Sequence, residues 1–78
     1  MSAPDPNARI RRARITKMPE RLLDPMPEVF VTLDDDREHF LFWYYPDELT
    51  FAPEDFIGLT VREALVLKAR RDIDYLRS

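Results

Sequence analysis

The sequence contains no cysteine, one glycine and one histidine among 78 residues. Without cysteine the chain can form neither disulfides nor thiolate sites for zinc or iron–sulfur clusters, and a single histidine excludes a multi-histidine metal site. Gly58 alone cannot make a glycine-rich phosphate-binding loop, which needs several glycines. We therefore expect no cofactor and no structural metal.

Long apolar runs are also absent, and no stretch approaches the length of a transmembrane helix. The N-terminal residues are polar and rich in proline, and they lack the apolar core of a signal peptide. These two absences predict a soluble, cytoplasmic protein without a membrane partner.

Large side chains do occur together, at six consecutive positions: Phe40, Leu41, Phe42, Trp43, Tyr44 and Tyr45. Such a run is typical of a strand that is covered on both faces of its sheet. Strict alternation would place Phe40, Phe42 and Tyr44 on one face and Leu41, Trp43 and Tyr45 on the other. Each face needs a partner of comparable bulk.

The chain divides into a disordered tail, residues 1–7, and a single domain, residues 8–78. The domain contains a basic segment (8–18), a β-hairpin (28–45) and a C-terminal helix (60–77). The basic segment alternates in polarity, which fits an edge strand, but a disordered arm is an equal alternative. The predicted fold class is α+β: a small antiparallel sheet packed against one helix.

The start of the helix is marked by a capping box, in which Thr60 and Glu63 bond each other's backbone N–H groups. Apolar residues follow at helical spacing, at Val61, Leu65, Ala69, Ile73 and Leu76. We expect this stripe to cover one face of the aromatic strand. The other face is left for the 19–27 connection, the 49–57 segment or another molecule.

Charge is segregated along the chain. The net charge is +4 over residues 1–21, −9 over residues 22–61 and +2 over residues 62–78. The basic segment, with Arg9, Arg11, Arg12, Arg14 and Lys17, is a candidate nucleic-acid contact, or it neutralises the acidic middle.

The candidates for catalysis are sparse. Asp34-Asp35-Asp36 reads as a solvated turn rather than a cation site. His39 has no cysteine to activate, and the only serines are Ser2 and Ser78, so a Ser/His/Asp arrangement is not expected. The sequence therefore predicts a protein that is not an enzyme.

Residues 55–64 resemble the opening of PASTA domains and potato-inhibitor-I-type segments. These families share a Gly-x-Thr/Ser-x-x-Glu-Ala helix start, matched here from Gly58 to Ala64. The resemblance covers ten residues, and the capping box accounts for it. It implies no function for this chain.

An uncovered aromatic face is rare on a monomer, and tryptophan and tyrosine often anchor interfaces. The sequence therefore predicts a non-catalytic protein-interaction module, such as an accessory factor or inhibitor of a bacterium or its phage. It would bind a protein partner, most simply a second copy as a homodimer, through the aromatic strand. A nucleic-acid-binding protein that uses the basic segment is the alternative, and a small enzyme is a third.

Overall fold

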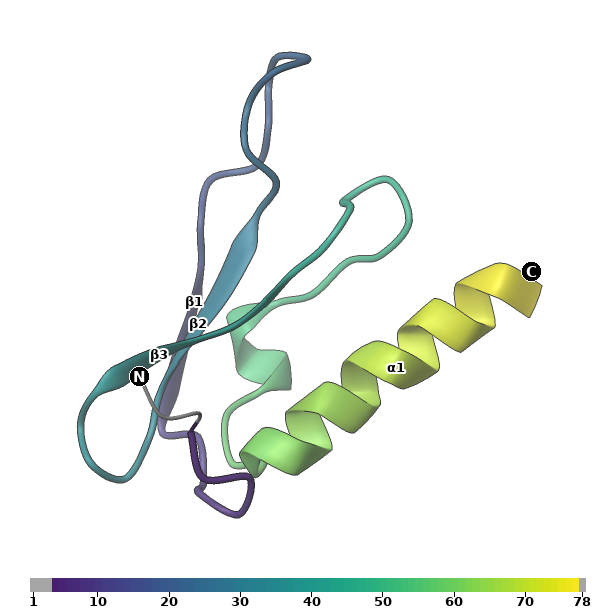
Figure 1. Cartoon of the computed structure of the whole chain (residues 1–78). Coiled ribbons are helices and arrows are strands. Elements are labelled where there is room, and N and C mark those ends of the chain that lie inside the picture. Colours follow the sequence, from purple (N-terminus) through teal and green to yellow (C-terminus); the bar gives the residue numbers. More distant parts are fainter. Residues whose placement is uncertain (1–3, 78) are drawn as a thin grey trace.

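A computed structural model describes residues 4–77 of the chain. It contains three strands, β1 (Arg12–Ile15), β2 (Glu28–Thr32) and β3 (Glu38–Trp43), and a C-terminal helix, α1 (Val61–Arg77). A 3-10 turn at Pro53–Asp55 precedes α1. The strands form one antiparallel sheet in the order β1-β2-β3 (Figure 1). The predicted α+β class is confirmed.

Strand β1 lies at one edge of the sheet, where Ala13 pairs with Val31 and Ile15 with Val29. Of the two alternatives for the basic segment, the structure therefore contains the edge strand. Its arginines alternate with Ala13 and Ile15, which are partly buried against the core. Charged side chains on an edge strand discourage pairing with a further strand.

The connection between β2 and β3 is a tight hairpin. The N–H of Leu33 donates to the carbonyl of Arg37, and Asp36 adopts a positive φ of 60°. Aspartate tolerates this left-handed conformation better than most residues do. The acidic run thus forms the hairpin turn that the sequence predicts.

A β-bulge at Leu41 interrupts the alternation of β3. Val29 pairs with Phe42, whereas the next residue, Phe30, pairs with Phe40, so Leu41 is the extra residue. A bulge shifts every residue beyond it to the opposite face. The prediction that Phe40 shares a face with Phe42 and Tyr44 is therefore wrong, because Phe40 lies on the same face as Trp43.

The core lies on one face of the sheet and is covered mainly by the segment between β3 and α1. Phe51 and Phe56 pack against Phe42, with ring centroids 5.2 and 5.8 Å away. The remaining buried apolar side chains are Ile10, Pro27, Val29, Val31, Leu33, Tyr44, Leu49, Val61 and Ala64.

Helix α1 covers the sheet far less than its apolar stripe predicts. Only Val61 and Ala64, in its first turn, are buried. Leu65, Ala69, Ile73 and Leu76 are exposed, because Phe51 and Phe56 already occupy the core face and α1 diverges from the sheet (Figure 1). The expectation that this stripe covers the aromatic strand is wrong.

The start of α1 is nevertheless firmly held. The capping box is present: Glu63 N–H donates to Thr60 Oγ1, and Thr60 N–H donates to Glu63 Oε1. The N–H groups of Val61 and Arg62 donate to the carbonyls of Ala8 and Pro6. Helix N-termini leave such donors without intrahelical partners, so the N-terminal segment completes this one.

The segment 1–7, predicted as a disordered tail, falls only partly within the structure. Residues 1–3 lie outside the described residues. Ala8 N–H donates to Asp5 O and closes a turn. The carbonyls of Pro6 and Ala8 in this turn accept the hydrogen bonds from the start of α1.

Candidate interaction surface

The face of the sheet opposite the core carries four aromatic residues, Phe30, Phe40, Trp43 and Tyr45, which we name the open aromatic face. Phe40, Trp43 and Tyr45 are 47%, 46% and 51% exposed. The rings form two edge-to-face pairs: Phe30 with Phe40 at 5.7 Å and Trp43 with Tyr45 at 5.0 Å. Within residues 4–77, no element lies across this face.

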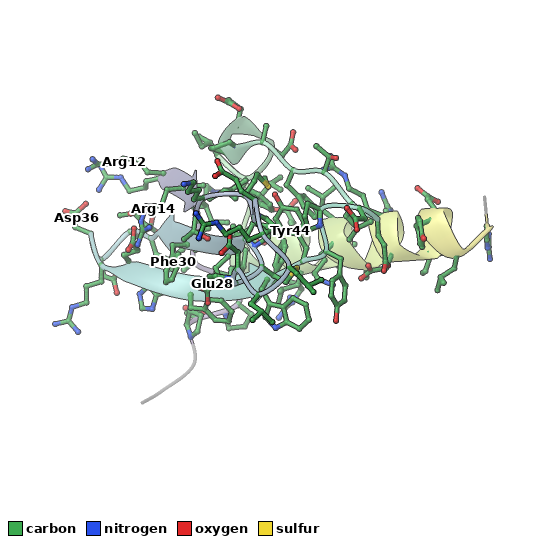
Figure 2. The ribbon with its side chains drawn as sticks, turned by 90° about the horizontal axis from the view of Figure 1, so that it is seen from above. Arg12, Arg14, Glu28, Phe30, Asp36 and Tyr44 are labelled. Atoms are coloured by element: carbon green, nitrogen blue, oxygen red, sulfur yellow. The ribbon has the colours of Figure 1, made fainter. Side chains whose placement is uncertain are left out.

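An arginine and a glutamate complete one end of the open aromatic face. The Arg14 guanidinium lies 4.4 Å from the centroid of the Phe30 ring, and Figure 2 shows the two side chains next to each other over the sheet. Arg14 also donates two hydrogen bonds of 2.7 Å to the Glu38 carboxylate. This bidentate pair lowers the pKa of Glu38 and neutralises the local charge.

A shallow hollow adjoins the other end, beside Trp43 and Tyr45. Pro25, Met26 and Glu28 line its remaining wall. The 16–27 connection extends beyond the sheet here as a long loop (Figure 1), and Leu22 at its tip is 96% exposed. The loop therefore does not cover the aromatic side chains.

The structure separates the six residues predicted as an interface into a buried and an exposed group. Phe42 and Tyr44 are buried in the core, and Leu41 is half-buried at the bulge. Phe40, Trp43 and Tyr45 are exposed. Phe30, which is partly buried and pairs with Phe40, lies on the same face and was not among the six predicted residues.

Tyr44 lies where the sheet approaches α1 (Figure 2). Its hydroxyl group is buried and has no hydrogen-bond partner within the described residues, and burial raises its pKa. A buried unpaired hydroxyl is destabilising.

We expect Tyr44→Phe to increase the free energy of unfolding by about 1 kcal/mol in urea titrations, whereas Tyr45→Phe, on the surface, should leave it unchanged. A loss of stability in Tyr44→Phe would show that the hydroxyl is paired.

The five residues proposed as a nucleic-acid contact are dispersed, and most are engaged. Arg9 donates to Gly58 O, Arg11 pairs with Asp36 at 2.9 Å, and Arg14 pairs with Glu38. Lys17 lies 3.7 Å from Glu20. Of these five residues, Arg12 alone makes neither an ion pair nor a side-chain hydrogen bond within residues 4–77, since the contact of Arg9 is with a backbone carbonyl. Two of these pairs join the basic segment to the acidic middle.

His39 lies beside the hairpin turn. Its Nε2 is 3.3 Å from Asp35 Oδ2. The pKa of Asp35 is lowered, chiefly because its carboxylate accepts a hydrogen bond from the Arg37 N–H. The contact with His39 lowers it further. Within residues 4–77, no three His, Asp or Glu side chains gather in an arrangement that could hold a metal ion.

Arg71 joins the middle of α1 to the segment between β3 and α1. Its guanidinium donates to Thr50 O at 2.6 Å and to Asp55 Oδ2 at 3.2 Å, and it lies over the Phe51 ring. Asp55 also accepts the Ala52 N–H at 2.9 Å. The pKa of Asp55 is lowered, first by that backbone bond and then by Arg71.

The lowered pKa of Asp55 determines how the stability of the fold changes with pH. The unfolded chain binds the Asp55 proton more readily than the folded chain, so the stabilisation is present above the ordinary carboxyl pKa and is lost as the pH falls through the folded value. We expect Asp55→Asn to make the decline in unfolding free energy below about pH 4 shallower than in the wild type. Urea titrations over a pH series would measure this, and an unchanged slope would exclude Asp55 as a source.

No helix in the described part of the chain is long and apolar enough to cross a membrane. Comparison with protein-family models, with curated proteins and with solved structures gives no match.

Proposed function

We propose that this protein is a non-catalytic protein-interaction module whose contact surface is the open aromatic face. The observation that carries the proposal is the half-exposed set of Phe40, Trp43 and Tyr45 on a sheet face that no described element covers. Full burial of such side chains is worth about 2–3 kcal/mol each. A contiguous patch of this kind marks interaction sites on soluble proteins.

The charges around this face favour a protein over a nucleic acid. Arg14 is held by Glu38, and Arg11 is held by Asp36. A phosphate would have to displace these carboxylates, and the acidic middle of the chain would repel it. Aromatic rings with a neutral polar rim are instead typical of the core and rim of a protein interface.

The proposal is tested by the native mass of the protein in crude cell extract. We expect the wild-type chain to migrate well above its monomer mass of 9.3 kDa. The double variant Phe40→Ala/Trp43→Ala should migrate as a monomer because it lacks two anchors of the face. Leu22→Ala/Leu23→Ala removes exposed apolar residues elsewhere and serves as the matched control.

The control variant should migrate like the wild type, and circular dichroism should show that both variants are folded. A folded Phe40→Ala/Trp43→Ala variant that still migrates with the wild type would overturn the proposal.

A further inference from the structure

The two edges of the sheet differ in how they are protected. β1 carries Arg12 and Arg14, and the chain just before it is bonded to Gly58 and Leu59 through Ile10. β3 carries Phe40, Leu41 and Trp43. Within residues 4–77, β3 makes no backbone hydrogen bond to any segment other than β2 and its flanking residues.

The backbone groups at this outer edge can be assigned from the ladder. Tyr44 N–H donates to Pro27 O, and Leu33 N–H donates to Arg37 O. Bonded and non-bonded pairs alternate in an antiparallel ladder. The N–H and C=O groups of Trp43 and Glu38 therefore point away from β2, which makes β3 a template for another strand.

Although α1 diverges from the sheet, two side chains from its middle, Lys68 and Asp72, form the second wall of an open groove at this edge. The groove has a volume of about 510 Å³ and is lined by residues 40–45, by Glu48 and Leu49, and by Lys68 and Asp72 of α1. Leu65 and Leu76 share the helix face of Lys68 and Asp72 by their spacing, and they are 45% and 79% exposed. The free edge and the exposed stripe thus adjoin one groove.

We propose that the occupant of the groove is a second copy of this chain, whose β3 pairs antiparallel with β3 of the first copy. This inference rests on the proposed function and names the partner. Antiparallel pairing places Glu38 of one copy near Trp43 of the other, whereas in-register parallel pairing would place Glu38 against Glu38. A reversed α1 likewise places the Lys68–Asp72 ion pair, which is joined at 2.8 Å within each helix, beside its counterpart, and it sets Leu65 opposite Leu76. The surface is thus self-complementary about a two-fold axis.

The area that a stable dimer needs shows why both elements take part. Such an interface buries about 800 Å² on each partner. A six-residue strand is only about 20 Å long, and its edge supplies a narrow strip of a few hundred Å² at most. In the proposed dimer, the stripe of α1 and the adjoining part of the open aromatic face would have to supply the remainder.

Sedimentation equilibrium of the purified full chain and amide hydrogen exchange by NMR test this inference. We expect a dimer in which the Trp43 N–H exchanges slowly, while the exposed Asp47 N–H exchanges fast. Leu65→Glu should weaken the dimer by at least about tenfold. Val66→Glu is the matched control, because Val66 is equally exposed, at 47%, on a different face of α1.

A monomer at all concentrations would overturn the inference. So would a dimer whose Trp43 N–H exchanges as fast as that of Asp47, or one that Leu65→Glu and Val66→Glu weaken equally. The two proposals can fail separately. A chain that is a monomer when purified but migrates well above 9.3 kDa in crude extract would refute the self-pairing and leave the proposed function standing.

Discussion

Replacing Phe56 by alanine is expected to leave much of the protein unfolded at room temperature. Phe56 is fully buried, and its ring packs against those of Phe42 and Phe51 at 5.8 and 5.5 Å. Truncating a buried phenylalanine costs about 3–5 kcal/mol. Small domains have stabilities near the lower end of about 5–15 kcal/mol, so this single loss removes most of the margin.

The neighbouring residue provides the control for this experiment. Ile57 is 51% exposed, so Ile57→Ala should change the free energy of unfolding by less than about 1 kcal/mol. Urea titration followed by far-ultraviolet circular dichroism measures both variants. Equal effects in the two variants would show that the segment before α1 does not form the cover of the sheet.

Trp43→Ala is expected to act on association rather than on folding. The side chain is only half-buried, and its principal ring contact is with Tyr45. Its loss should lower the free energy of unfolding by about 1 kcal/mol. As an interface anchor it should contribute at least about 2 kcal/mol to binding, or roughly a 30-fold weaker complex.

Two measurements on the same sample separate these effects: urea unfolding and the dissociation constant by sedimentation. Leu22→Ala is the control for the loss of an exposed apolar side chain and should change neither. If Trp43→Ala destabilised the fold by several kcal/mol and left association intact, Trp43 would be a core residue rather than an anchor.

Local patterns were sufficient to predict most elements of this fold. Thr60 and Glu63 mark the start of α1 through bonds between close neighbours, and the acidic residues after Leu33 mark the hairpin turn. Val29 and Val31 alternate with Phe30 and thereby place one face of β2 in the core. Each of these signals depends on residues only a few positions apart, which is why the sequence shows them.

The features that sequence reasoning missed depend on contacts across the fold. The bulge at Leu41 arises from the pairing of β3 with β2, so strict alternation misplaced Phe40. The stripe with Leu65 and Ile73 predicts a helix face that will be covered, but its spacing does not identify what covers it. The 49–57 segment is one of three candidates for covering the second face of the strand, but it has no periodic pattern that would assign Phe51 and Phe56 to the core.

The most direct test of the central claim is photo-crosslinking from position 43 in living cells. Trp43 is replaced by the photoreactive residue benzoylphenylalanine in the full chain, and Arg37, on the exposed hairpin turn, is replaced in the same way as a control. We expect a protein adduct from position 43 and none from position 37. The absence of an adduct at position 43, or equal adducts at both positions, would contradict the claim that the open aromatic face binds another protein.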